Sequence, residues 1–408
     1  MEASREPVER GSFFTGPGLL SAASSNDPTT VATLAVVGAA TGYALCWLVV
    51  LAAAMLAVVQ ALAAAVGAAC KTSLQGAIRR RFGRRWALVT LIAIVSVNLI
   101  TLVADIKAGA EAISLLTGLR GELFVVPFAC LVGFLLVSHS FARIERVLQL
   151  LPLAFVSYAA SAFLARFDVG ALLRGLLVPH LDLSFEQAAM AVAILGTMLT
   201  SYVYVWESLE IARRRPAQAA AAYYKWDAAF GMLAVGAVFL FVVVASAATL
   251  GVHHLHIDTA GDLARALTPL AGPWAGSLFG IGLLGSAILV VPILAGTNGY
   301  VAAQTFGWKG DLDAPLRDAR AFYAVVIASL ALGAVAALAP LSPVALLYWA
   351  SVAGGIATPL TLVLLVRLAV DRTAMGAARV RRPLAIAGWV ICGVVGTAAA
   401  AFLFSLLG

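Results

Sequence analysis

Residues 16–30 read GPGLLSAASSNDPTT, a polar run inside an otherwise apolar stretch of the chain. Proline lacks a backbone N–H and disfavours helix in the residue before it, so Asp27-Pro28 marks a natural break. Non-helical backbone at membrane depth is tolerated only where protein buries it or where it lines a cavity. The run therefore predicts a membrane-spanning segment, 17–41, whose helix is interrupted near its centre.

The composition indicates an integral membrane protein with many spans. Of the 408 residues, 62% are hydrophobic and 12% are charged, whereas soluble domains contain about 25% charged residues. Apolar stretches long enough to cross a bilayer alternate with charge clusters, and no soluble domain fits between them. We expect an all-helical protein with about eleven spans, at 17–41, 44–68, 87–116, 123–139, 147–165, 187–211, 228–251, 273–300, 321–339, 343–366 and 384–407.

Basic residues gather in alternate loops, and this pattern predicts the orientation of the chain. The loops after spans two, four, six, eight and ten are basic, whereas the opposite set holds mainly Arg120, Arg166, Arg174 and Arg265. The positive-inside rule then places the N-terminus in the cytoplasm and, after eleven spans, the C-terminus outside the cell membrane. The net charge of +7 is therefore attributed to topology.

A second polar interruption occurs in the sixth span, where residues 195–207 read LGTMLTSYVYVWE. The two interrupted spans hold corresponding positions if spans one to five and six to ten form inverted repeats. Such a pair is the sequence signature of a transporter with its site near the bilayer midplane. The expected organisation is a cytoplasmic tail, 1–12, and one transmembrane domain, 13–408, with repeats at 13–165 and 187–366 and an extra span at 384–407.

Other classes of site find little support in the sequence. The four cysteines lie far apart without a CxxC pair, so the sequence suggests neither a zinc site nor a disulfide framework. No phosphate-binding loop or hydrolase constellation occurs in a supporting context. His253, His254 and His256 form a metal-like cluster with Asp258, but histidines in a loop more often make a solvated patch. We therefore expect no enzyme activity, no cofactor and no nucleic-acid partner.

Short motifs along the chain follow an order and spacing that are typical of one transporter family. They include GPG at 16–18, Asp27-Pro28, GAATGYALCW at 38–47, Ala104-Asp105, VPHL at 178–181, the 195–207 segment, PILAG at 292–296 and FGW at 306–308. Together they resemble the Nramp (natural resistance-associated macrophage protein) family of divalent metal transporters, and most closely its bacterial, magnesium-transporter-like branch. The resemblance implies a LeuT-like fold with a metal ion bound between the unwound centres of spans one and six.

The resemblance also implies which residues bind the metal. The usual first-span motif of the family, DPGN, matches 27–30 here, so that Asp27 keeps the carboxylate and Thr30 replaces the amide with a hydroxyl. Asn26, beside Asp27, is a further oxygen donor. The alternative for Asp27 is a purely structural role as the cap of the second half-helix.

In the sixth span, the positions that match the metal-binding motif of the family are Thr197, Thr200, Ser201 and Tyr202. The methionine thioether, the proline and the histidine of the family motif are all replaced. A thioether is a soft ligand that favours transition metals, whereas hydroxyls and one carboxylate form a hard site. The resemblance therefore implies a site built from Asp27, Thr30 and Thr200, with Thr197 and Ser201 beside them, that binds Mg²⁺ or Mn²⁺. Each threonine has the alternative of bonding only its own helical turn.

Proton coupling, which the family achieves with titratable groups in spans three and six, is doubtful in this chain. Asp105 matches the span-three aspartate, but Ala108 stands where a glutamate is usual and Tyr202 replaces the histidine. Tyrosine, with an ordinary pKa of about 10, relays protons poorly at neutral pH. Tyr202, Asp105 and Glu207 remain candidates for the pathway, with structural pairing as the alternative for the two carboxylates.

The sequence thus favours a monomeric, multi-pass secondary transporter of a divalent cation in the cell membrane, working by alternating access. The lipid bilayer is its surroundings and the cation is its substrate. Two other functions stay open. One is a carrier of a small organic solute such as an amino acid, which needs a cavity beside Ala193 and Gly196. The other is a membrane sensor that binds without transport.

Overall fold

The computed structural model describes residues 27–138, 156–180, 184–214, 221–251, 257–312 and 314–406, with side chains from 214 to 230 left aside. Regular structure in these ranges is helical throughout. Asn26 and the three histidines at 253, 254 and 256 lie outside the described residues. The all-helical fold class predicted from the sequence is confirmed.

The N-terminal half of the described chain contains seven helices. They are α2 (Pro28–Thr41), α3 (Cys46–Cys70), α4 (Leu74–Phe82), α5 (Arg84–Thr117), α6 (Glu122–Val137), α8 (Ser157–Leu164) and α9 (Val169–Leu177). The second half holds α10 (Phe185–Met198), α11 (Ser201–Arg214), α12 (Ala221–Ser246), α13 (Ala260–Ala264), α14 (Thr268–Ala271), α15 (Ala275–Phe306), α16 (Arg320–Ala337), α17 (Pro343–Val370), α18 (Arg372–Met375) and α19 (Arg382–Ser405).

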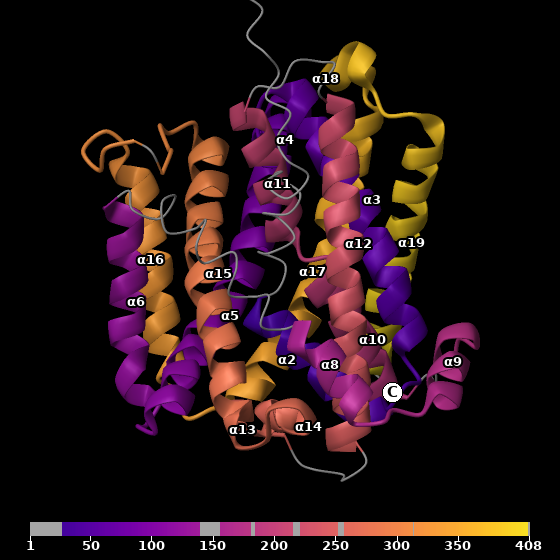
Figure 1. The fold of residues 1–408 in the computed structure, drawn as a ribbon. Helices are drawn as coiled ribbons and strands as arrows, with labels where there is room; N and C mark the ends of the chain where they lie inside the picture. The colour runs from indigo at the N-terminus through magenta and orange to yellow at the C-terminus, as the bar shows by residue number, and fades with distance from the viewer. Residues whose placement is uncertain are drawn as a thin grey trace, which may run out of the picture.

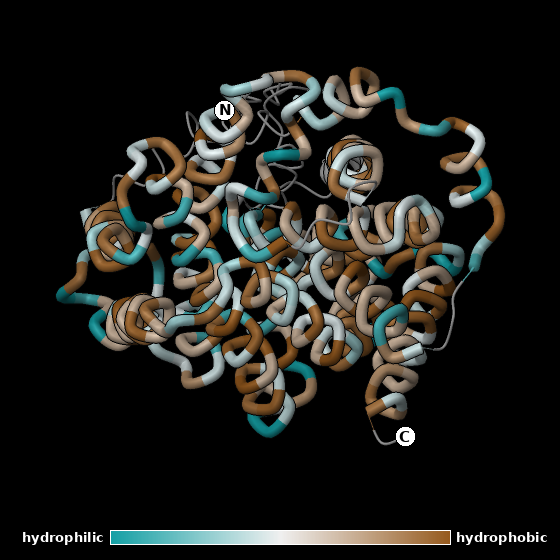
Figure 2. Tube along the Cα trace, turned by 90° about the horizontal axis from the view of Figure 1, so that it is seen from below, coloured by the Kyte–Doolittle hydropathy of each residue, from teal (hydrophilic) through white to brown (hydrophobic). Residues whose placement is uncertain are grey.

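Within the described residues, eight helical segments are long and apolar enough to cross a membrane, and α2 and α6 are shorter apolar helices. These helices match the expected spans except for the fifth, 147–165, which is described only from residue 156 onward. Figure 2 shows apolar residues throughout the bundle and along its outer rim. A soluble protein would cover that rim with polar groups, so the surface is suited to lipid.

The long helices run side by side, and their short connecting helices mark the two ends of the bundle. Figure 1 places α4 and α18 at one end and α9, α13 and α14 at the other. The arginines of α4, the end of α11 and the α17–α19 connection therefore share one end, as expected for alternate loops.

Small residues allow the central helices to pack closely. A Cβ placed on Gly38 of α2 would lie 2.3 Å from the Val243 carbonyl oxygen of α12, and one on Gly67 of α3 would lie 2.3 Å from that of Ser208 in α11. Membrane helices approach in this way because lipid provides no hydrophobic drive for their association. These close contacts hold α2 against α12, and α3 against α11.

Candidate metal and transport site

The described part of the first interrupted span begins at Asp27, which caps α2. Its Oδ1 accepts a hydrogen bond from the Thr30 backbone N–H at 2.6 Å, and Pro28 occupies the first helical turn, where its missing N–H costs nothing. The Asp27 carboxylate is only 2% exposed. The local sequence thus places a carboxylate at a helix N-terminus inside the bundle.

The second interrupted span is broken between α10 and α11, where Leu199 and Thr200 lie outside the helices. A threonine of α17, Thr358, donates to the Leu199 carbonyl oxygen at 3.4 Å. The backbone group freed by the break is therefore satisfied by a neighbouring helix, as buried backbone requires.

The two breaks meet through side-chain hydrogen bonds. The Tyr202 hydroxyl donates to Asp27 Oδ2 at 2.7 Å, and the Thr30 and Thr197 hydroxyls lie 2.8 Å apart. All four side chains are buried. The structure therefore brings Asp27, Thr30, Thr197 and Tyr202 together at the junction of α2, α10 and α11.

A second carboxylate lies beside this junction. Thr29, two residues after Asp27, donates its hydroxyl to Asp105 Oδ1 of α5 at 2.6 Å. Asp105 is fully buried, and its Oδ2 has no hydrogen-bond partner within the described residues. Thr29 and Asp27 are two residues apart at the start of α2, so the Asp105 and Asp27 carboxylates lie in the same part of the bundle. A cation bound there would interact favourably with both carboxylates and with the unpaired Oδ2.

The other predicted residues occupy positions around the junction. Thr200 and Ser201 are buried at the break but do not hydrogen-bond Asp27. Glu207, farther along α11, is fully buried as well. No group of three or more histidine, cysteine, aspartate or glutamate side chains that suits a metal occurs in the described part of the chain. Any metal here therefore depends on one or two carboxylates together with neutral oxygens.

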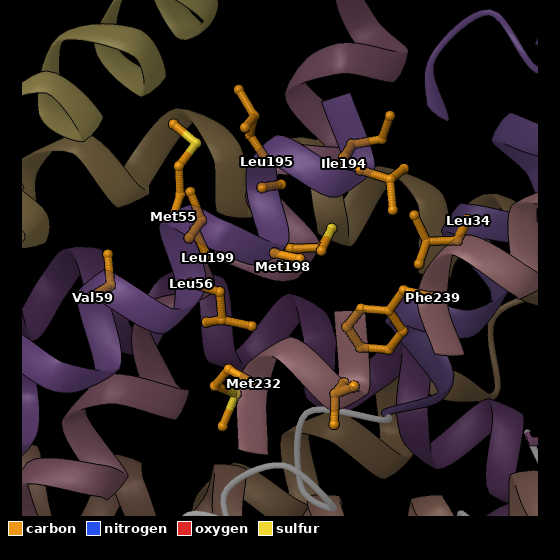
Figure 3. Close-up of a cluster of buried hydrophobic side chains, with 14 of the residues drawn as sticks. Leu34, Met55, Leu56, Val59, Ile194, Leu195, Met198, Leu199, Met232 and Phe239 are labelled. Carbon is orange, nitrogen blue, oxygen red and sulfur yellow. The ribbon is translucent and has the colours of Figure 1, made fainter. Parts of the chain in front are cut away.

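Met198 does not restore the soft ligand that Thr200 lacks. This methionine ends α10 two residues before Thr200 and is 2% exposed. Its side chain lies in an apolar cluster with Leu34, Leu56 and Phe239 (Figure 3). The thioether therefore serves packing, and the polar junction stays a hard-oxygen environment.

Sequence reasoning did not assign a role to Thr29 or to the polar residues of the tenth span. Thr33 of α2 bonds the Ser351 hydroxyl of α17 at 2.7 Å, and Thr358 of the same helix reaches the α10–α11 break. Ser351 and Thr358 are seven residues apart, which is two helical turns and hence one face of α17. This polar face within an otherwise apolar span is the sequence feature that could have predicted the contacts of α17 with the two breaks.

Two interrupted helices that meet around a buried carboxylate define a secondary transporter with its site inside the bundle. The family model described as "Natural resistance-associated macrophage protein-like" matches residues 18–405. The chain therefore belongs to the Nramp family, is a transporter, and is not an enzyme.

Known relatives agree with this placement. A protein of Deinococcus radiodurans named divalent metal cation transporter MntH is 30% identical over 97% of this chain and 90% of its own length. The manganese transporter of Eremococcus coleocola has a similar structure, with a TM-score of 0.77, 19% identity, and coverage of 96% of this chain and 85% of that one. A transporter of the nucleobase-cation-symport-1 family shares the LeuT-like architecture at a TM-score of 0.58, with 16% identity over 96% and 92% of the two chains.

Replacing Tyr202 with phenylalanine tests the bond that orients Asp27. The variant keeps the ring in its buried position and removes the hydroxyl that donates to Oδ2. On the proposal made below that Asp27 binds the cation, loss of a group that orients this ligand costs about 10–100-fold in affinity, so we expect the apparent KM for the cation to rise by about tenfold. Tyr204→Phe is the matched control, since the Tyr204 hydroxyl bonds Thr361 rather than Asp27. Equal KM values in both variants would contradict the orienting role.

Proposed function

We propose that this chain carries a divalent metal cation, Mg²⁺ or Mn²⁺, across the cell membrane by alternating access around α2, α10 and α11. The observation that supports this most strongly is the buried Asp27 carboxylate at the meeting point of two interrupted helices. An intramembrane carboxylate is costly, and its usual reason is an ion or proton pathway. The relatives named as divalent metal and manganese transporters point in the same direction.

The proposed ligands are Asp27, Thr30 and Thr200, with Thr197, Ser201 and Asn26 as further oxygen donors. Thr30 and Thr197 support the proposal because their hydroxyls face each other across the two breaks. Carboxylate, hydroxyl and carbonyl oxygens suit a hard ion, and Mg²⁺ is usually held by one or two carboxylates with several waters retained. The proposed site therefore accepts a partly hydrated cation.

Asp105 is proposed as the second carboxylate of this site. It supplies the negative charge that a divalent ion needs beyond Asp27, and its unpaired Oδ2 is available for a cation or its water shell. In this role Asp105 supports binding and is not a proton carrier. Glu207 is proposed as a carboxylate of the pathway beyond the break.

An Asp105→Asn exchange distinguishes these two roles. The asparagine oxygen still accepts from Thr29, so the exchange removes charge with little change in shape. We expect cation affinity to fall about tenfold or more, in the range seen for groups that support a metal site. Glu111→Gln, farther along α5, is the matched control and should transport normally. A normal KM together with an altered internal pH trace would instead assign Asp105 to proton movement.

Transport without proton coupling is proposed. Ala108 stands where the family usually has a glutamate that titrates. Tyr202, which replaces the histidine, donates its hydroxyl hydrogen to Asp27 in a hydrogen bond. Downhill movement of the cation along its own gradient then drives transport.

The alternative of an organic solute is less compatible with the packing. A Cβ on Gly196 would lie 2.0 Å from the Ser351 carbonyl oxygen, and Ala193 is fully buried. The face that an amino acid would need is occupied by α17 in this conformation. A sensor that binds without flux is distinguished by the transport measurement below.

We also propose the organisation inferred from the sequence: inverted repeats at 13–165 and 187–366, an extra span at 384–407, a cytoplasmic N-terminal tail at 1–12, and an external C-terminus. The collection of arginines at one end of the bundle supports this orientation by the positive-inside rule. A monomer is proposed as the working unit.

The deciding experiment measures flux of Mg²⁺, Mn²⁺ and Ca²⁺ into proteoliposomes while the internal pH is recorded. We expect saturable uptake of Mg²⁺ or Mn²⁺ without a matching pH change. A pH change that follows the cation would replace the uncoupled mechanism with a coupled one. Absence of flux for all three ions in folded protein would reject the transport function and leave a sensor.

A further inference from the structure

A basic cavity lies between the end of α17 and the start of α19, away from the transport junction. Its volume is about 750 Å³, within the range of ligand sites in proteins. Four of the residues that line it are arginines, namely Arg372, Arg379, Arg381 and Arg382. The cavity lies at the same end of the bundle as α4 and α18.

No acidic side chain among the described residues forms an ion pair with the arginines of this cavity. Asp371 is the nearby acidic group, but its carboxylate is already engaged by Arg81 at 2.7 Å and by the backbone N–H groups of Thr373 and Ala374. A concentration of unpaired guanidinium groups around one cavity favours an anion, and phosphate oxygens match their geometry.

The position of two of the arginines adds to this preference. Arg381 is the residue before α19, and Arg382 is its first residue. A helix N-terminus carries partial positive charge, so cations there are opposed by the helix dipole. These arginines therefore weaken the isolated helix end, whereas a bound anion would interact favourably with both the guanidinium groups and the free backbone N–H groups.

The apolar surface next to the cavity indicates where the rest of the ligand lies. Ala385 lines the cavity, and Trp389 is one helical turn farther along the same face of α19. Trp389 is 43% exposed, and the neighbouring Ile386 is 63% exposed. A phosphate group in the cavity is thus continuous with an apolar face suited to acyl chains, and tryptophan commonly lies at such a boundary.

We propose that this cavity binds the headgroup of an anionic phospholipid, with the phosphate held by Arg379, Arg381 and Arg382 and the acyl chains along Ile386 and Trp389. Basic pockets between membrane helices are known to suit such headgroups. The lipid would bridge α17 and α19, which pack closely where Gly388 meets Val366. It therefore stabilises the attachment of the last span to the bundle.

The test compares the wild type with the triple variant R379Q/R381Q/R382Q in a neutral detergent. Phosphatidylglycerol, phosphatidylcholine with the same acyl chains, or inorganic phosphate is added, and bound lipid and the unfolding temperature are measured by native mass spectrometry and a thermal melt. The matched control is R80Q/R84Q/R85Q, which removes the same charge from the same end of the bundle but leaves the cavity lining intact.

We expect phosphatidylglycerol to bind the wild type and the control and to raise their unfolding temperatures. The triple variant should bind it roughly five-fold more weakly for each arginine removed. Equal phosphatidylglycerol binding by the wild type and the triple variant would overturn the proposed site. Protection by inorganic phosphate as strong as that by phosphatidylglycerol would overturn the lipid assignment in favour of a free-anion site. Equal binding of phosphatidylcholine would overturn the need for negative charge.

Discussion

An Asp27→Asn variant is expected to lose transport of Mg²⁺ and Mn²⁺ while remaining folded. Asparagine caps helices about as well as aspartate, so the bond from the Thr30 N–H to the side chain persists. The exchange removes the negative charge that attracts a divalent ion, and the amide nitrogen in place of Oδ2 no longer accepts a hydrogen bond from the Tyr202 hydroxyl. Because even supporting groups contribute about 10–100-fold to metal affinity, loss of the ligand itself should lower flux at subsaturating cation by about 100-fold or more.

A matched control is provided by Asp168, which caps α9. Its carboxylate accepts from the Ala171 N–H at 2.9 Å in the same capping arrangement, but it is exposed at the end of the bundle opposite α4 and α18. Asp168→Asn should leave flux unchanged. Wild-type flux in Asp27→Asn would mean that the cation does not need this charge, and the proposed site would be wrong.

Gly196→Ala is expected to destabilise the fold strongly, because the added methyl group has no space between α10 and α17. A Cβ at this position would lie 2.0 Å from the Ser351 carbonyl oxygen and 2.2 Å from the Gly355 backbone nitrogen of α17. Both are backbone atoms, so no rotamer change makes room, and α10 must move away from α17. Overpacking typically costs 1–3 kcal/mol, and we expect at least about 3 kcal/mol here.

The measurement is the unfolding temperature of purified protein, with Gly393→Ala as the control. Gly393 is also helical, in α19, but nothing lies within 4 Å of its added Cβ, so alanine there should be neutral or slightly stabilising. Gly196→Ala should melt well below both the wild type and the control. Coinciding melting curves for all three proteins would show that α10 and α17 do not approach as closely as the structure places them.

Much of the fold was predictable because membrane insertion depends on local properties of the chain. Apolar length and charged loops located the spans, and α5, observed as Arg84–Thr117, differs little from the predicted 87–116. The sequence was less informative about where each span ends. The fourth span is predicted at 123–139, whereas α6 runs from Glu122 to Val137. Helix ends are set by capping and packing as well as by hydropathy.

The candidate site was partly predictable for the same reason. Polar residues and a proline inside apolar spans located the two breaks, and the resemblance to the Nramp family pointed to Asp27, Thr30, Thr197 and Tyr202, which the structure places together. The link from Thr29 to Asp105 was not predictable, because the two residues are separated by 76 positions and both sit on helices. Hydrogen bonds of this kind depend on how two helices are rotated and packed against each other.

The sequence alone determined that this protein lies in a membrane, where its helices run, and that two of them are interrupted at Asp27-Pro28 and near Thr200. Tertiary structure decided which groups face each other: Tyr202 toward Asp27 across 175 positions, α17 against Gly196, and unpaired arginines around one cavity. Hydropathy and proline act on neighbouring residues and can be read along the chain. Contacts between helices arise only when side chains from distant segments occupy the same volume.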